Sequence, residues 1–353
     1  MKILILVNWK IEYSDKVPKD KQPPDYFIKG EPYWFFRYFH GRNYDIDVID
    51  IRSFKWLENF EKNKIRFYIW QTIRVLPKLN KYDVVLSHGM QSGIMLALFR
   101  RLFGKGKYKH IVFDIGAFNS AKTSGRTLLF MQFAGKSIDG IIYHTKSQKD
   151  YYEKCHPWLV NKSTYIPFGT DADFFDYDNY ECDEKENYIL CVGYNKRDWD
   201  TLIKAYMMTD KKYKLYLLGN EKLDVMDDNV HLIKAVDVNQ MKNMILASRF
   251  CVLPLKSYNY SYGQMTLLQQ MALGKAVIVA DVPSVSEYIN DGEVMTYVPE
   301  NVASLSGKIQ KLMDDDALCK SLGDKASIAV KEKYNEQIMA NKIENFVNEI
   351  VKK

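Results

Sequence analysis

Short apolar runs alternate with longer helical stretches along this chain, and they do so in two series separated by a break. In the first series the runs are rich in β-branched residues and too short for helices, which predicts buried parallel strands. The predicted strands are 2–7, 44–51, 82–88, 110–116 and 140–145. Helical spacing predicts helices at 32–41 and 63–79. In the second helix, which Pro77 ends, the apolar residues that share one face are Ile65, Ile69, Ile73 and Leu76.

An aromatic, acidic stretch without periodicity follows at 161–187, which is typical of an interdomain connection. A second series begins after it, with amphipathic helices at 200–207 and 239–248. Its predicted strands are 188–193, 213–220, 229–233, 250–255, 276–281 and 295–299. Alternating strands and helices indicate an α/β fold with parallel sheets. We therefore predict two Rossmann-like, doubly wound domains that face each other across a cleft, where ligands usually bind.

Length and composition agree with two soluble domains. The chain has 353 residues, of which 47% are hydrophobic and 27% charged. The apolar run within the first residues, "MKILILVNWKIEY", is too short for a signal peptide. No apolar run in the sequence is long enough to span a bilayer. We therefore expect a cytoplasmic protein. The cysteines lack CxxC spacing, so we expect free thiols rather than disulfides or zinc ligands at Cys155, Cys182, Cys191, Cys251 and Cys319.

Positive charge is concentrated in one segment. Residues 62–109 contain eleven Lys or Arg and one acid, Asp83, and their cations alternate with aromatic and aliphatic side chains. Such a segment is typical of an element that lies on an anionic membrane surface, which predicts peripheral attachment to the inner face of a membrane. Nucleic-acid binding is the alternative, but no recognisable nucleic-acid-binding module accompanies the charge.

A turn that enters a helix is the strongest candidate binding element. "SYGQMT" (261–266) precedes a helical run and contains no acid, histidine or metal ligand. The first turn of a helix has free N–H groups and a partial positive charge, so it can bind a pyrophosphate without a charged side chain. Gly263 would allow close approach, Ser261 and Thr266 offer hydroxyls, and Gln269 could reach a ribose. The alternative interpretation is an ordinary capped helix of the core.

Two further loops follow strands of the second series and should lie at the same edge of its sheet. They are "GYNKRD" (193–198) and the pair Gly219 and Asn220.

Several stretches resemble one known family in the order in which they occur. "YILCVGYNKRDWDTLIKAY", "KLYLLGN", "NVHLIKAVDVNQMKNMILASRFCVLPL" and "SYGQMTLLQQMALGKAVIVADVPSVSEYINDGE" resemble the second half of the retaining GT-B glycosyltransferases of family four, and "YIPFGTDADFF" (165–175) resembles that family's interdomain segment. The resemblance implies an acceptor-binding domain at 1–168 and a nucleotide-sugar-binding domain at 169–334. It also implies that a last helix, 335–353, packs back on the first domain.

The resemblance also implies roles for individual residues. The family's Glu-x7-Glu element falls on Ser261 and Gln269, so neither carboxylate is present here. Basic residues of the first loop would bind the donor phosphates, with Arg197 stabilising the leaving nucleotide and Lys196 beside it. The predicted donor site consists of Gly193, Lys196, Arg197, Gly219, Asn220, Lys256, Ser261, Tyr262, Gly263, Gln264, Met265, Thr266 and Gln269.

The first domain resembles the family less. Its first strand ends in "NWK", where many relatives have glycines. Asp114 and His144 lie at the ends of predicted strands, where they would face the cleft. They are candidate catalytic residues that could orient a hydroxyl, although a structural role for each is the alternative. The pattern of Asp171 and Asp173 matches the metal-binding DxD of another glycosyltransferase fold, but it lies in the interdomain segment. We therefore predict no metal site.

The predicted function is retaining transfer of a hexose from a UDP- or GDP-linked donor to a hydroxyl of a lipid-linked or cell-surface glycan precursor, without metal or other cofactor. The resemblance implies that the donor phosphate helps to deprotonate the acceptor, so no protein nucleophile is needed. The missing Glu pair leaves an alternative, a non-catalytic GT-B subunit that binds nucleotide or stabilises a partner enzyme.

Overall fold

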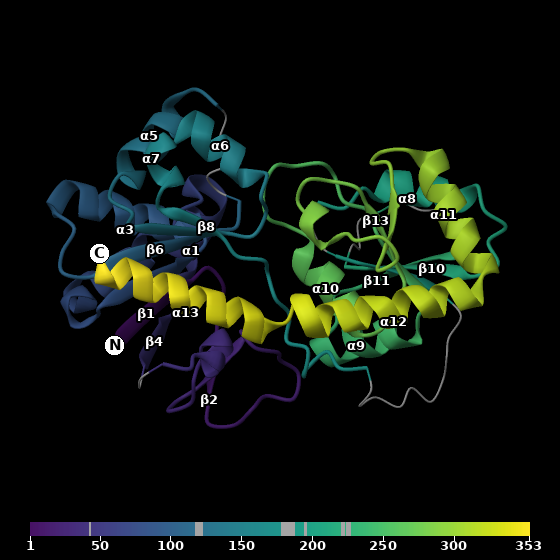
Figure 1. Cartoon of the computed structure of the whole chain (residues 1–353), viewed down its shortest axis with the longest axis horizontal. Coiled ribbons are helices and arrows are strands. Elements are labelled where there is room, and N and C mark those ends of the chain that lie inside the picture. Colours follow the sequence, from purple (N-terminus) through teal and green to yellow (C-terminus); the bar gives the residue numbers. More distant parts are fainter. Residues whose placement is uncertain (42–43, 117–122, 178–187, 194–195, 220–222, 224–226) are drawn as a thin grey trace.

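The computed structural model describes residues 1–353 except 42–43, 117–122, 178–187, 194–195, 220–222 and 224–226. Two six-stranded parallel sheets with flanking helices form the molecule (Figure 1), as predicted. The first sheet has the order β4-β1-β5-β6-β7-β8 and the second β11-β10-β9-β12-β13-β14. We call each sheet with its helices the first and the second domain.

The strands of the first sheet are β1 (Lys2–Val7), β4 (Asp45–Ile49), β5 (Val84–His88), β6 (Lys109–Asp114), β7 (Gly140–Tyr143) and β8 (Ser163–Tyr165). Those of the second are β9 (Tyr188–Val192), β10 (Lys214–Leu218), β11 (Val230–Ile233), β12 (Phe250–Leu253), β13 (Val277–Ala280) and β14 (Met295–Tyr297). A separate pair joins β2 (Glu12–Ser14) to β3 (Tyr26–Ile28).

The α-helices that accompany the first sheet are α1 (Lys55–Phe60), α2 (Ile69–Val75), α3 (Met90–Phe103), α5 (Arg126–Gly135), α6 (Gln148–Cys155), α7 (Pro157–Val160) and α13 (Glu336–Lys352). Those of the second are α8 (Trp199–Met207), α9 (Val238–Ala247), α10 (Gln264–Ala272), α11 (Val302–Asp314) and α12 (Asp316–Lys333). Three short 3₁₀-helices are η1 (Trp34–Tyr38), η3 (Leu76–Lys81) and η4 (Ser286–Tyr288), and η2 (Glu61–Ile65) is a short π-helix.

Burial explains why the positions of the strands could be predicted from the sequence. The strands β1, β5, β9, β12 and β13 are buried along almost their whole length, as expected for parallel strands covered on both faces. Every predicted strand is present. The prediction missed β8, which lies inside the stretch predicted as the interdomain connection, and it missed the small pair β2–β3.

Two predicted helices of the first domain differ from the structure. The segment 32–41 forms only η1, in which Trp34, Phe35 and Phe36 are all buried. Trp34 has a φ of 50°, which lies outside the α-helical region. The segment 63–79 is divided into part of η2, α2 and most of η3. Its inner face carries Gln71, whose side-chain amide donates to two strand carbonyls at 2.8 and 2.9 Å, whereas Ile73 is 49% exposed.

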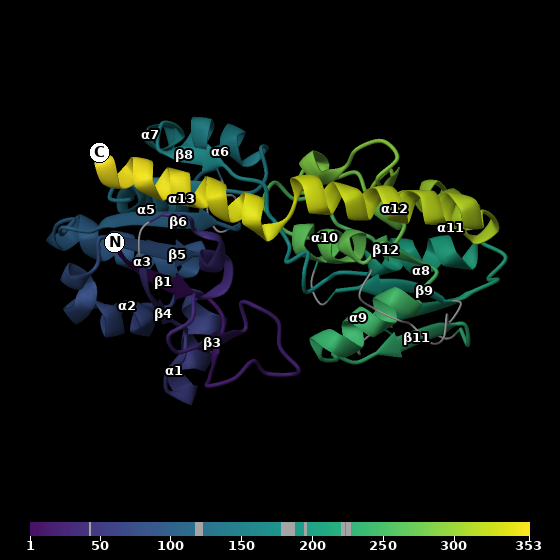
Figure 2. The same cartoon turned by 60° about the horizontal axis from the view of Figure 1, so that its bottom comes forward.

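The end of the chain connects the two domains. Helices α12 and α13 follow each other across the molecule, with α12 on the second domain and α13 on the first (Figures 1 and 2). Side chains of α13 such as Ile343 and Val347 belong to the same apolar core as Ile3 and Ile5 of β1. In the described part of the chain, no helix is long and apolar enough to cross a membrane.

Candidate functional site

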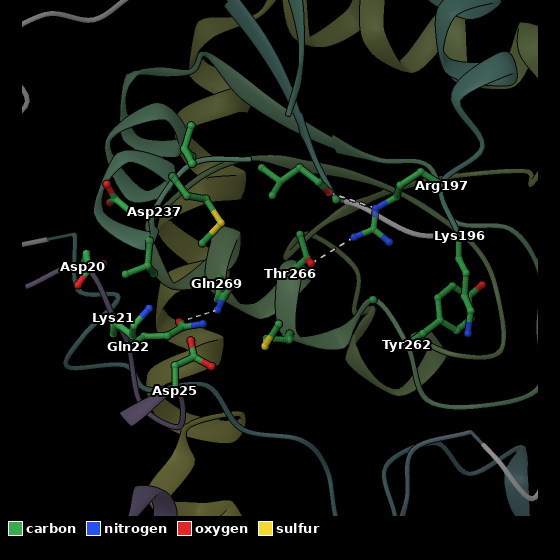
Figure 3. A pocket seen from close by; sticks show the side chains of 17 residues that line it. Asp20, Lys21, Gln22, Asp25, Lys196, Arg197, Asp237, Tyr262, Thr266 and Gln269 are labelled. Atoms are coloured by element: carbon green, nitrogen blue, oxygen red, sulfur yellow. Dashed lines mark hydrogen bonds between the residues drawn. The ribbon is translucent and has the colours of Figure 1, made fainter. Parts of the chain in front are cut away.

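A cavity of about 750 Å³ lies where the two domains meet, and we call it the α10 cavity. Figure 3 shows its lining side chains. The loop after β9, the start of α9 and the first turns of α10 form one side, and the loop between β2 and β3 forms the other. The lining residues are Asp20, Lys21, Gln22, Asp25, Val192, Gly193, Lys196, Arg197, Val236, Asp237, Val238, Met241, Tyr262, Gly263, Met265, Thr266 and Gln269.

The N-terminus of α10 opens on this cavity. Gly263 precedes the helix with a φ of 83°, and a Cβ there would lie 2.7 Å from the Leu255 side chain, so both backbone and space require glycine. No side chain of the described residues caps the helix. Its first N–H groups, with the partial positive charge of the helix end, can therefore bind an anion.

Arg197 lies beside this helix end with 8% of its surface exposed. Its Nε donates to the Val192 carbonyl at 3.1 Å, and Nη2 donates to Thr266 Oγ1 at 3.2 Å (Figure 3). Burial lowers the pKa of Arg197, which nearby Cys191 and Tyr262 raise in part. Gly193 leaves room for the guanidinium, because a Cβ there would lie 2.3 Å from Nε. A fixed cation thus adjoins the helix end.

Lys196 extends from the same loop to three tyrosines. Its Nζ lies 3.9 Å from the ring centroid of Tyr260 and 5.7 and 5.5 Å from those of Tyr258 and Tyr262. These distances are within the range of cation–π contacts. Burial lowers the pKa of Lys196. The tyrosines therefore hold a second positive charge at the edge of the cavity.

Gln269 lies on α10 about one turn inside the helix, and it is 4% exposed. Its Nε2 donates to Gln22 Oε1 at 3.2 Å, which joins the second domain to the β2–β3 loop of the first (Figure 3). The same loop accepts a hydrogen bond at the Lys19 carbonyl from Asn239 of α9. Figure 2 shows the loop, in purple, extending toward the second domain.

Other predicted donor residues lie elsewhere. Gln264 points across the domain boundary, where its Nε2 donates to Thr145 Oγ1 at 2.8 Å, and Ser261 donates to Gln264 at 3.3 Å. Lys256 is exposed. Gly219 uses its N–H to bind the Ile233 carbonyl at 2.8 Å. None of these four lines the α10 cavity, and Asn220 lies outside the described residues.

Asp114 and His144 are buried inside the first domain. The Asp114 carboxylate accepts from Tyr152 at 2.5 Å and from the Gly116 N–H at 3.1 Å. His144 Nδ1 lies 2.7 Å from the Ile166 carbonyl, and burial lowers its pKa to about 4. Neither residue lines the α10 cavity.

A second cavity, of about 330 Å³, adjoins the first, with which it shares Gln22, Asp25, Met265 and Gln269. We call it the aromatic chamber. Its lining residues are Asn8, Trp9, Gln22, Pro23, Pro24, Asp25, Trp34, His88, Ile115, Phe168, Gly169, Thr170, Asp171, Phe175, Met265, Gln269 and Glu336.

The acids of the interdomain segment have partners within the protein. Asp171 Oδ2 lies 2.7 Å from Arg37 Nη2, which is also 2.7 Å from Glu336 Oε2, and Asp171 Oδ1 accepts from the N–H groups of Asp173 and Phe174. Among the described residues, no three His, Cys, Asp or Glu side chains gather in a way that could hold a metal ion.

The sequence interpretation missed the contribution of the first domain to both cavities. The lining residues of the β2–β3 loop lie in a stretch without periodicity, Trp9 follows β1, and His88 is the last residue of β5. The only available signal was position, since ligands bind beyond the carboxyl ends of parallel strands.

Comparisons with known proteins agree with this arrangement. Residues 186–315 match the family described as glycosyl transferases group 1, which confirms the predicted resemblance. No curated protein matches the chain in sequence. Sucrose-phosphate synthase from Thermosynechococcus elongatus superimposes with a TM-score of 0.70 at 14% identity, over 99% of each chain.

Two further solved structures have the same architecture. Anabaena HepE, solved with UDP and glucose, superimposes with a TM-score of 0.69 at 11% identity, over 99% of this chain and 100% of its own. WaaG, a glycosyltransferase involved in lipopolysaccharide biosynthesis, superimposes with a TM-score of 0.64 at 15% identity, over 98% of this chain and 99% of its own. The predicted GT-B fold is thereby confirmed.

Proposed function

We propose that the protein, whose residues 186–315 match the glycosyl transferases of group 1, transfers a hexose from a nucleoside-diphosphate sugar to an acceptor hydroxyl with retention. The observation that carries the proposal is the N-terminus of α10, which opens on the α10 cavity beside a buried arginine. A pyrophosphate is the ligand that fits free helix N–H groups and a guanidinium together.

Each part of the cavity has a role in this proposal. The helix end and Arg197 would bind the diphosphate and stabilise the negative charge that develops on the leaving nucleotide. Gln269 would hydrogen-bond the ribose, and Lys196 would add charge at the edge of the cavity. Transfer would occur on one face of the sugar, with a donor phosphate oxygen taking the proton of the acceptor hydroxyl. The reaction as proposed uses no metal.

We propose UDP as the first nucleotide to test and GDP as the second. Anabaena HepE has been solved with UDP and with UDP-glucose, and it shares the fold of this chain. The proposed division assigns residues 1–168, with the last helix 335–353, to acceptor binding and residues 169–334 to the nucleotide sugar. The acceptor would be a lipid-linked or cell-surface glycan precursor.

A membrane surface is part of the proposal because most cations of the basic segment are exposed on the first domain, which also exposes large apolar side chains. The exposed cations of the basic segment are Lys62, Lys64, Arg66, Lys78, Lys81, Arg101, Lys105 and Lys107. Arg100 differs, since it is buried and pairs with Asp139 at 2.8 Å. Phe103 is 74% exposed at the end of α3, and Trp56 of α1 is 70% exposed. We propose that this surface binds the anionic inner face of a membrane.

Release of the nucleotide from UDP- and GDP-linked hexoses, without any acceptor, tests the enzymatic proposal. We expect slow release of UDP or GDP, and NMR should show that the first sugar anomer formed has the configuration of the donor. An inverted product would contradict retention. Tight nucleotide binding with no release from any donor would contradict the enzyme and favour the non-catalytic subunit.

A further inference from the structure

Gln264 connects the first turn of α10 to the first domain, whereas the sequence predicted that it would contact the donor. It is the first residue of the helix and is 3% exposed. Its Nε2 donates to Thr145 Oγ1 at 2.8 Å and also to the Ser284 carbonyl, and its Oε1 accepts from Ser261 Oγ at 3.3 Å. Both polar atoms of the amide therefore have partners outside the α10 cavity, which Gln264 does not line.

Thr145 is the partner of Gln264 in the first domain. It lies two residues after β7 and is fully buried, and its own Oγ1 donates to the Ser284 carbonyl at 3.0 Å. Removal of the hydroxyl would leave the buried amide of Gln264 with one partner fewer, and a buried polar group without a partner is costly. Thr145 does not line the α10 cavity, so it has no direct contact with a nucleotide bound there.

The first turn of α10 is held from two sides. Gly263, which precedes it, has no side chain, and within the described part of the chain no side chain caps the helix. On the side of the second domain, Thr266 accepts from Arg197 at 3.2 Å (Figure 3). On the side of the first domain, Gln264 donates to Thr145. The turn that is proposed to bind the diphosphate therefore depends in part on a residue of the other domain.

We propose that Gln264 is a positioning residue, which orders the first turn of α10 through Thr145 so that the N–H groups of the turn already face the diphosphate. The proposal rests on the proposed function, because it takes the α10 cavity as the donor site. An ordered turn binds more tightly than a turn that must become ordered on binding, since less conformational entropy is then lost. Thr145 thus raises the affinity of the second domain for UDP. The coupling is reciprocal, so bound UDP stabilises this contact between the domains by the same factor.

Calorimetric titration of the full chain with UDP, or with GDP if only GDP binds, tests the coupling. Thr145→Val keeps the shape but removes the hydroxyl, and it should weaken nucleotide binding ~5–10-fold, the scale of one buried hydrogen bond. Thr145→Ser keeps the hydroxyl and should bind as the parent does. Gln264→Ala should show a similar loss, and the double variant Gln264→Ala/Thr145→Val no more than the larger single loss. Parent-like affinity in Thr145→Val, or losses that multiply in the double variant, would overturn the proposal.

Glu287→Ala is the matched control. Glu287 lies in η4 of the second domain, and its Oε1 accepts from the Lys146 N–H at 3.0 Å, so the variant removes a contact across the same boundary without touching α10. It should leave nucleotide affinity unchanged. An equal loss in Glu287→Ala would mean that any weakening of the boundary impairs binding, which would overturn the specific role of Gln264. A parent that binds neither UDP nor GDP is a different result, because it would overturn the donor proposal itself.

Discussion

The two domains have the same kind of sheet but build their sides of the cleft differently. The second domain offers backbone N–H groups of α10 and one buried guanidinium from the adjacent loop, all close to strand ends. The first domain offers side chains from a loop that leaves its sheet and crosses toward α9 and α10. The side formed by the second domain therefore resembles a fixed anion site. The side formed by the first domain resembles an aromatic and acidic wall.

This difference indicates which chemical groups each domain can recognise. A helix end recognises phosphate, which every nucleotide sugar carries, so it needs no special side chains. Under the proposed function, the side chains of the first domain would meet the acceptor, and acceptors differ in charge and shape. The first domain also contains the buried histidines His88, His110, His144 and His156.

The largest expected effect is acid destabilisation of the first domain. Burial lowers the pKa of His88 and His110 to about 3 and that of His144 to about 4, from an ordinary value of about 6.5. Between pH 4 and 6.5 the unfolded chain therefore binds more protons at these sites, so the free energy of unfolding falls as pH falls. Each net proton changes it by on the order of 1.4 kcal/mol per pH unit.

Glu336 acts in the opposite direction, because burial raises its pKa to about 7 and its ionisation with rising pH costs stability. Three histidines outweigh one glutamate, so calorimetric unfolding should show a clear loss from pH 6.5 to 4.5. His110→Gln, which keeps a hydrogen bond for Ser87 but cannot titrate, should flatten the slope. A stability that stays constant over this range would contradict the burial of these imidazoles.

The next effect concerns the anion side of the cleft. Arg197→Ala should lower the rate of nucleotide release at least ~10-fold, the scale of one charge-assisted hydrogen bond. Lys204→Ala, which removes an exposed cation paired with Asp200 on α8, is the matched control and should change little. Equal rates in the Arg197 variant and the parent would place the diphosphate elsewhere.

Gln269 should contribute less. Gln269→Ala should weaken UDP binding by about 1–2 kcal/mol, whereas Gln269→Glu should keep most of the affinity, since a carboxylate accepts from ribose hydroxyls. Gln22→Ala removes the partner of Gln269 in the first domain without removing the ribose contact. Calorimetric titration should therefore give Gln22→Ala an affinity for UDP between that of the parent and that of Gln269→Ala. The reverse order would mean that the amide pair fastens the domains together and does not bind ribose.

The smallest effect concerns the outer surface of the first domain. Lys107→Ala should weaken binding to anionic vesicles by on the order of 1 kcal/mol, and the loss should shrink as salt increases. Lys311→Ala on α11 of the second domain is the control. Sedimentation with neutral and acidic vesicles provides the comparison. Equal recovery of the parent with both kinds of vesicle at low salt would remove the membrane from the proposal.

The sequence predicted the sheets better than the cleft. Buried strands such as β9 and β12 are continuous apolar runs, so their signal is local. The α10 turn and Arg197 were found because they follow those strands directly. Gln22 could not be found in this way, because a crossing loop brings it to the cavities. Trp9 does follow β1, so its position was the one signal that pointed to it. The segment 32–41 is not an α-helix, because Trp34 has a φ of 50° there, which its spacing of apolar residues does not reveal.

A crystal structure of the full chain with UDP tests the central claim most directly. We expect the diphosphate oxygens within about 3 Å of the first N–H groups of α10 and of the Arg197 guanidinium, with the ribose near Gln269. A nucleotide bound away from the N-terminus of α10, with Gly263 and Thr266 making no contact with phosphate, would contradict the donor site.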